Sequence, residues 1–128
     1  MEFLAIAEQF RNSPREAERR TSIGRCYYAL FNLAREKLDG VIVFRALPED
    51  HRDLVKYLKL TRGTPSRLGH ILEDLRNRRN DADYKMNLLI NEQKSQQAFD
   101  FATSALNQMR ALSEQDFIAI KASFDRST

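Results

Sequence analysis

The sequence predicts an all-α protein, an up-and-down bundle of four to five helices within a single domain that covers residues 1–124. The chain has 128 residues, which is room for one domain and not comfortably for two. It contains only 4 Gly and 3 Pro, whereas a β-sandwich or barrel needs a turn every ~8–12 residues. Hydrophobic residues make up 42% of the chain and charged residues 30%, a composition typical of a folded domain.

Apolar residues at helical spacing predict two helices in the first part of the chain. The first covers residues 2–11 and ends where Ser13 and Pro14 interrupt the pattern. Ser13, Pro14 and Glu16 have the spacing of a capping box, so they predict the start of a second, longer helix. This helix is expected to continue to Leu38, because an Asp-Gly pair follows it.

Two further helices are expected in the middle of the chain. Residues 41–44 are apolar and β-branched, but no second strand is available to pair with them, so we expect a buried loop segment. The third helix is expected over residues 48–60, with acidic residues in its first turn. The fourth is expected over residues 65–81, because Thr64-Pro65 is typical of a helix start.

The last part of the chain predicts a fifth helix and a short extension. Asn91 is a suitable N-cap for a helix that extends to Leu112, and one or two amphipathic turns follow Ser113. Residues 125–128 are expected to form a frayed tail. Apolar residues near the C-terminus and in segment 41–44 are more than four helices readily bury, so we expect a homodimer interface to cover the remainder.

The distribution of charge favours a partner that carries phosphate. The formal net charge of +3 comes from 21 basic and 18 acidic residues. Residues 52–85 carry nine basic and five acidic side chains, a net of +4, whereas the flanking segments are close to neutral. The alternative interpretation is a solvated helix surface with ordinary arginine usage.

Several kinds of site are not expected. Cys26 is the only cysteine, which excludes an intramolecular disulfide and a multi-cysteine zinc site, and its place on an apolar stripe predicts a small core residue. His51 and His70 are expected at the surface. We therefore expect neither a metal nor a cofactor. No apolar run approaches the ~18 residues of a membrane span and the N-terminus does not resemble a signal peptide, so the expected location is cytoplasmic.

Arg79 is the most informative single residue, because helical geometry directs it towards the core. At 100° per residue it lies about 20° from Leu68, on the stripe that contains Leu72 and Leu75. A cation in such a place needs a carboxylate, a helix end or a bound anion. One interpretation is a structural ion pair with Asp83, four residues later. The other is an arginine in a cleft that grips a phosphate with two hydrogen bonds.

Two segments resemble the signatures of HEPN-domain proteins. Residues 20–34, RTSIGRCYYALFNLA, resemble the helix S-x-x-R-x-Y-Y-A-x-F-x-x-A, and residues 75–84, LRNRRNDADY, resemble L-R-x-x-R-N-x-A-D-Y. The resemblance covers about residues 1–112 and implies a four- to five-helix bundle that commonly dimerises. In active members of the family, R-N-x-x-x-H supplies a metal-independent endoribonuclease site where two subunits meet.

The resemblance implies that Arg79 and Asn80 are catalytic, whereas Tyr84 occupies the position of the family's histidine. A tyrosine phenol is protonated at neutral pH and is therefore a poor base. Asp83 or Tyr84 would have to transfer the proton instead, and Tyr84 could also orient a phosphate or stack on a base. The residues expected to bind phosphate or RNA are Arg25, Tyr28, Arg76, Arg78 and Lys85.

These residues support competing hypotheses about function. The first is an RNA-directed protein of a bacterial or archaeal toxin–antitoxin or defence system, an endoribonuclease with a degenerate R-N-x-x-x-Y motif. The second is a non-catalytic module that docks a protein partner or holds a nucleotide. A minimal nucleotidyltransferase is the partner that the resemblance implies, because small HEPN proteins are encoded beside one as toxin and antitoxin. The third is a purely structural helical dimer in which Arg79 serves only in an ion pair.

Overall fold

The computed structural model describes residues 2–46 and 48–127, and this part of the chain is all-α, as predicted. It contains six helices, one more than the largest number expected. None of these helices is long and apolar enough to cross a membrane. The helices are α1 (Glu2–Phe10), α2 (Glu16–Lys37), α3 (Asp50–Lys59), α4 (Thr64–Tyr84), α5 (Glu92–Arg110) and α6 (Glu114–Ser127).

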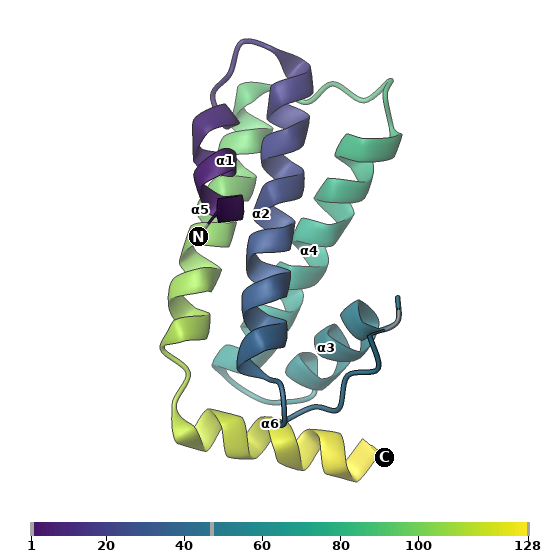
Figure 1. Cartoon of the computed structure of the whole chain (residues 1–128), viewed down its shortest axis with the longest axis vertical. Coiled ribbons are helices and arrows are strands. Elements are labelled where there is room, and N and C mark those ends of the chain that lie inside the picture. Colours follow the sequence, from purple (N-terminus) through teal and green to yellow (C-terminus); the bar gives the residue numbers. More distant parts are fainter. Residues whose placement is uncertain (1, 47, 128) are drawn as a thin grey trace.

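Helices α1, α2, α4 and α5 form an up-and-down bundle, and α2 packs against each of the other three (Figure 1). The other two helices, α3 and α6, lie at one end of the bundle. There α3 packs against α4, and α6 crosses beneath the long helices and contacts both α3 and α4. The loop between α4 and α5 lies at the opposite end.

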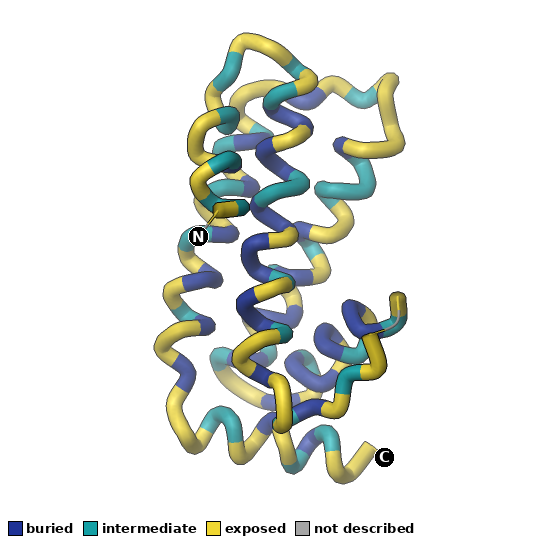
Figure 2. The backbone as a smooth tube through the Cα atoms, in the orientation of Figure 1, coloured by how far each residue is buried: buried dark blue, intermediate teal, exposed yellow. Residues whose placement is uncertain are grey.

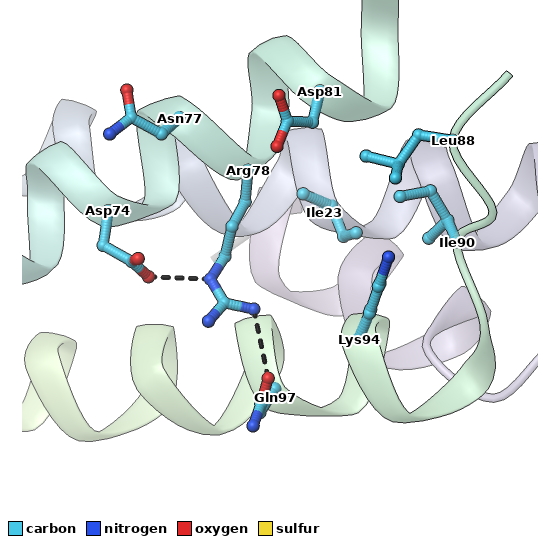
Figure 3. A pocket seen from close by; sticks show the side chains of 9 residues that line it. All are labelled: Ile23, Asp74, Asn77, Arg78, Asp81, Leu88, Ile90, Lys94 and Gln97. Carbon is cyan, nitrogen blue, oxygen red and sulfur yellow. Dashed lines mark hydrogen bonds and ion pairs between the residues drawn. The ribbon is translucent and has the colours of Figure 1, made fainter. Parts of the chain in front are cut away.

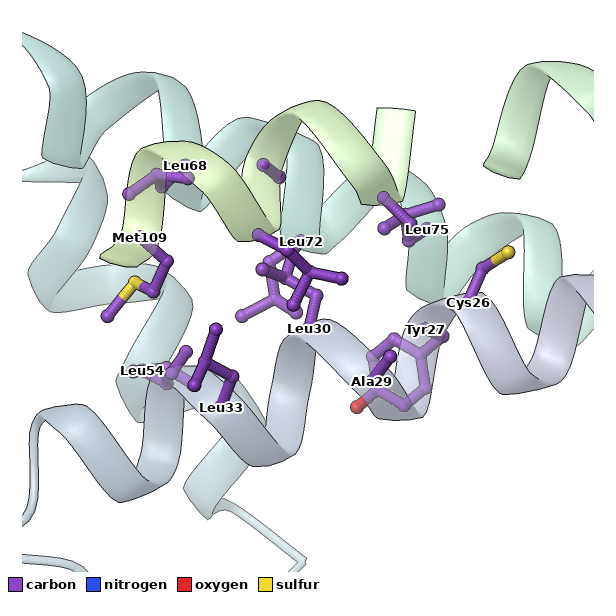
Figure 4. Close-up of a cluster of buried hydrophobic side chains, with 14 of the residues drawn as sticks. Cys26, Tyr27, Ala29, Leu30, Leu33, Leu54, Leu68, Leu72, Leu75 and Met109 are labelled. Carbon is purple, nitrogen blue, oxygen red and sulfur yellow. The ribbon is translucent and has the colours of Figure 1, made fainter. Parts of the chain in front are cut away.

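The core lies along the inward faces of the long helices (Figure 2). Leu30 of α2 and Leu72 of α4 are fully buried in the centre of the side-chain cluster drawn in Figure 4. Cys26 is also fully buried, and burial raises the pKa of its thiol to about 12. The prediction that Cys26 is a core residue rather than a reactive thiol is therefore confirmed.

Helix α6 is the element that the sequence pattern underestimated. Ser113 begins it as predicted, since its hydroxyl accepts from the backbone N–H of Asp116. The helix then runs for 14 residues, much longer than one or two turns. Its Ile120 is fully buried, and the Phe124 ring lies edge-on to Tyr57 with 5.0 Å between centroids. Packing over the end of the bundle stabilises a helix that would be marginal alone.

The extent of α6 changes two expectations. Residues 125–127 are helical rather than a frayed tail, and Thr128 lies outside the described residues. Several apolar side chains that we expected in a dimer interface are packed by the chain itself. Segment 41–44 is a loop as predicted, with Ile42 fully buried, and the aromatic residues Phe44 and Phe117 pack against the core.

The helix starts were predicted with mixed success. The capping box at Ser13 was wrong, because α2 begins after Arg15, which has no side-chain cap. Ser13 instead donates to the Glu18 carboxylate at 2.6 Å and accepts from the backbone N–H of Arg15. The N-cap at Asn91 is confirmed, since its side chain accepts from the backbone N–H of Lys94 at 2.9 Å.

Candidate functional site

A pocket of about 220 Å³ lies between α2 and the C-terminal end of α4. Five residues of α2 form one wall of the pocket. They belong to two series of residues spaced four apart, which lie on the same face of a helix. Asp83 of α4 forms the other wall. The pocket thus gathers cations, a phenol and a carboxylate, and its lining residues are Arg20, Thr21, Gly24, Arg25, Tyr28 and Asp83.

Arg79 lies beside this pocket and points inward, as predicted. Its side chain is 17% exposed, and its Nε lies 3.4 Å from Oδ2 of Asp83. Its Nη1 donates to the Tyr28 hydroxyl at 2.9 Å, and its guanidinium carbon lies 5.4 Å from the ring centroids of both Tyr27 and Tyr28. The predicted ion pair with Asp83 is therefore present, and two aromatic rings help to stabilise the cation.

The guanidinium of Arg79 is only partly satisfied by these contacts. Its Nε is buried and makes no hydrogen bond, because Asp83 lies at ion-pair distance without hydrogen-bond geometry. Its Nη2 makes no hydrogen bond to any described residue, and it is not sealed from solvent. Arg79 is not itself a lining residue of the pocket, but its Nη2 can still donate to a ligand that reaches it.

Gly24 of α2 faces the aliphatic part of the Arg79 side chain. A Cβ at Gly24 would lie 3.8 Å from Cγ of Arg79, which is van der Waals contact. The aliphatic part of Arg79 therefore packs over the glycine, and the guanidinium reaches the hydroxyl of Tyr28.

Arg20 has a structural role that the sequence pattern did not reveal. It is buried, and its guanidinium donates to the carbonyls of Ala82 at 2.8 Å, Lys85 at 3.3 Å and Leu88. These carbonyls lie at and beyond the last turn of α4, where backbone acceptors have no helical partner. Arg20 lies near the start of α2, and its acceptors lie at the end of the antiparallel helix α4. This role could be recognised only once α4 was known to pack beside α2.

Some predicted site residues come together and others do not. Arg25 and Tyr28 line the pocket together with Asp83, and the guanidinium of Arg25 also lies 5.5 Å from the ring of Phe3. Tyr84 is the last residue of α4 and is 73% exposed, so it lies at the open end of the helix.

The remaining catalytic candidate, Asn80, is half-buried on α4, and among the described residues its side chain has no hydrogen-bond partner. Helical geometry places it about 100° from Arg79 around the helix. Asn80 therefore follows Arg79 on α4 without being part of the pocket lining.

The other basic candidates are directed elsewhere. Arg78 donates to Asp74 at 2.7 Å and to Gln97 at 3.3 Å in a pocket of about 360 Å³ between α4 and α5 (Figure 3). Arg76 lines a third pocket, between α3 and α4. Lys85 forms an ion pair with Asp81 at 3.0 Å. Successive residues rotate by 100° around a helix, so one run of basic residues is divided among three faces.

His51 is buried, so the expectation of a surface position was wrong. Its Nδ1 lies 2.7 Å from the Tyr27 hydroxyl, and burial, together with the charge of Arg76, lowers the pKa of His51 to about 4. Burial also raises the pKa of Tyr27 to about 12. We expected a surface position because His51 lies at a helix start. The local sequence does not reveal that this part of α3 packs against Tyr27 and Phe31 of α2. His70 is exposed as expected.

Within the described part of the chain, no three His, Cys, Asp or Glu side chains come together in a way that could hold a metal ion. Comparison with protein-family models, with curated proteins and with solved structures gave no match. The function must therefore be inferred from the chemistry of the pockets.

Proposed function

We propose that the protein is a HEPN-type, RNA-directed protein of a toxin–antitoxin or defence system, and that the α2–α4 pocket binds a phosphate of RNA. One observation carries most of this proposal. The two segments that resemble HEPN signatures, residues 20–34 and 75–84, lie on α2 and α4, which pack against each other around this pocket. Segments 40 residues apart in sequence thus supply one cluster of polar residues.

The pocket has suitable chemistry for a phosphodiester. Arg25 and the uncommitted Nη2 of Arg79 provide charge-assisted donors, which are the strong hydrogen bonds to phosphate. The Tyr28 hydroxyl holds Arg79 in position. The exposed ring of Tyr84 is available to stack on an unpaired base, an interaction that tolerates any sequence. The expected ligand is single-stranded RNA rather than a duplex.

The same residues suggest how cleavage would proceed. The ribose 2′-oxygen forms a bond to the adjacent phosphorus as the bond to the 5′-oxygen breaks, leaving a 2′,3′-cyclic phosphate and a 5′-hydroxyl. Asp83 accepts the 2′-proton, and Tyr84 protonates the leaving oxygen. Arg79 stabilises the charge that develops on phosphate, and Asn80, outside the pocket lining, donates a positioning hydrogen bond to the RNA beside it.

Incubation of labelled single-stranded RNA with purified protein in chelator tests the enzymatic proposal. We expect products with a 2′,3′-cyclic phosphate from the wild type and from Arg110→Ala, an exposed control on α5, but not from Arg79→Ala. Equal inertness of the wild type and Arg79→Ala would contradict cleavage and leave RNA binding to be measured separately.

A second candidate is a non-catalytic docking module for a minimal nucleotidyltransferase. It is favoured by tyrosine in the place of the motif histidine, and by three exposed apolar side chains at the end of α4 and in the following loop: Tyr84, Met86 and Leu89. Co-purification of a nucleotidyltransferase from the native host, and its loss with Leu89→Ser, would support docking. Recovery of the protein without that partner would count against it.

The proposal includes a cytoplasmic homodimer, as the HEPN resemblance implies. Light scattering of the purified protein should then give a mass twice that of the chain. A monomer at micromolar concentration would contradict this part and would require the α2–α4 pocket to act within one chain.

A further inference from the structure

A separate pocket of about 200 Å³ lies between the first half of α3 and the middle of α4. It is open enough for a small ligand and larger than the ~30 Å³ that one water molecule occupies. None of its lining residues also lines the α2–α4 pocket that we propose for RNA. Its lining residues are His51, Arg52, Val55, Glu73, Arg76 and Asn77.

His51 directs an N–H donor into this pocket. The side chain is 6% exposed, and its Nδ1 lies 2.7 Å from the Tyr27 hydroxyl. When the Tyr27 hydroxyl donates to Nδ1, the imidazole proton is on Nε2, and this is the tautomer that the proposed site uses. Among the described residues Nε2 has no hydrogen-bond partner, and it is not sealed from solvent, so it faces the pocket that His51 lines.

Two arginines beside this imidazole are also uncommitted. Arg52 and Arg76 are exposed, and neither has a hydrogen-bond or ion-pair partner among the described residues. The charge of Arg76 is close enough to lower the pKa of His51. Asn77, which follows Arg76 on α4, adds a side-chain amide to the lining. The pocket therefore holds an excess of donors over acceptors, including two guanidinium groups that can bind an oxyanion through paired hydrogen bonds.

The nearby acidic groups are already engaged. Glu73 is the one carboxylate of the lining, and it accepts from Nζ of Lys59 at 2.6 Å, which lowers its pKa. The first turn of α3 contains two further acids, and both form ion pairs: Asp50 with Arg35, and Asp53 with Arg45. The net charge facing the pocket is therefore positive.

We propose that the α3–α4 pocket binds the oxyanion of a phosphate group, held by His51 Nε2–H, Arg52, Arg76 and the amide of Asn77. The Tyr27 ring contacts residues of both sites, since its centroid lies 5.4 Å from that of the His51 ring and 5.4 Å from the guanidinium carbon of Arg79. The inference does not depend on RNA binding in the α2–α4 pocket, because inorganic phosphate alone is a sufficient probe.

Titration of inorganic phosphate into ¹⁵N-labelled protein at constant ionic strength tests this inference. We expect a saturable shift of the His51 Nε2 resonance that chloride does not produce. Arg76→Gln should weaken phosphate binding by about tenfold, as loss of a charge-assisted hydrogen bond predicts. Arg52→Gln should act in the same direction. Both residues are exposed, so both variants are expected to fold.

Arg110→Gln is the matched control, because Arg110 is also exposed and has no ion-pair partner among the described residues. It should bind phosphate as the wild type does. The inference is overturned if phosphate leaves the His51 resonance unmoved, or if Arg76→Gln and Arg110→Gln weaken binding equally. Arg79→Gln distinguishes the two pockets, since it should impair RNA binding while leaving the phosphate-induced shift at His51 intact.

Competition identifies the source of the phosphate. Displacement of inorganic phosphate by a nucleoside 5′-monophosphate would assign a terminal phosphate, and displacement by RNA without terminal phosphates would assign a backbone phosphate. Either result supports the inference. Failure of both to displace inorganic phosphate would contradict a biological ligand at this site.

Discussion

Arg79 combines a structural position with unused binding capacity. Its aliphatic part packs over Gly24, and its guanidinium is stabilised by Asp83 and by the rings of Tyr27 and Tyr28. Its Nη2 makes no hydrogen bond to a described residue and is open to solvent, so it is available to a ligand. The free Nη2 is the reason to assign Arg79 a ligand.

Replacement of this arginine separates structural and binding roles. Arg79→Ala should lower the free energy of unfolding by about 1–2 kcal/mol, through loss of packing, because Asp83 is half-exposed and can be solvated without its partner. RNA affinity should fall at least tenfold. Urea denaturation and RNA binding measure the two effects. A loss of ~3–5 kcal/mol with unchanged RNA affinity would instead indicate a purely structural ion pair.

His51 should make stability depend on pH. Its pKa is about 4 in the folded protein, against an ordinary 6.5, so between these values the unfolded chain binds more protons. The free energy of unfolding should therefore fall as pH decreases from 6.5 to about 4, with a slope approaching ~1.4 kcal/mol per pH unit.

The carboxyl pKa values of Glu16 and Glu73 are lowered from 4.5, so the stability that these groups contribute is lost as the pH falls towards and below about 4.5. Urea denaturation between about pH 5.5 and 6.5 therefore reports mainly on the histidine. His51→Gln should flatten the dependence in this range. An equally steep dependence in that variant would show that another group is responsible.

At the scale of elements, the start of α2 anchors the loop between α4 and α5. Arg19 donates to the carbonyl of Ile90 at 2.7 Å, while Arg20 binds the carbonyls at the end of α4. The Glu16 carboxylate accepts from the backbone N–H of Ile90. These contacts hold the last turn of α4, which carries Asp83, against the pocket.

Removal of one anchor should be strongly destabilising. Arg20→Ala leaves several backbone carbonyls without a donor, and we expect the free energy of unfolding to fall by about 3 kcal/mol. Chemical denaturation provides the measurement. Arg110→Ala, at an exposed and unpaired position, should change stability by less than ~0.5 kcal/mol. Similar losses in the two variants would rule out the anchoring role.

The two helical glycines should respond oppositely to alanine. Both substitutions gain helix propensity of about 1 kcal/mol. At Gly24 the new methyl group makes ordinary contact with Arg79, so Gly24→Ala should raise the melting temperature. At Gly69 the methyl group would lie 3.0 Å from the backbone N of Lys59, so α3 must shift. Gly69→Ala should therefore lower the melting temperature. Equal effects would mean that α3 and α4 pack less closely than described.

Most helices could be predicted because their apolar faces recur within the local sequence. The stripes of α2, α4 and α5 follow the helical period, and Asn91 supplies a recognisable cap. The capping box at Ser13 was wrong because the hydroxyl prefers Glu18, and the length of α6 depends on its packing against α3 and α4. Both outcomes are set by tertiary contacts.

At the scale of the whole molecule, the fold divides a basic run of α4 among different neighbours. Helical geometry alone was enough to predict the inward direction of Arg79 and its ion pair with Asp83. It was not enough to predict the surroundings of Arg76 and Arg78, because they depend on α3 packing beside Arg76 and α5 packing beside Arg78. The buried contact between Tyr27 and His51 was missed for the same reason.

The affinity of the protein for short single-stranded RNA, measured by fluorescence anisotropy in chelator over a series of salt concentrations, tests the proposed function most directly. We predict that Arg79→Gln weakens binding at least tenfold and reduces the salt dependence by about one phosphate contact. Arg110→Gln should bind as the wild type does. Equal affinity and salt dependence in the wild type and Arg79→Gln would contradict an RNA site in the α2–α4 pocket.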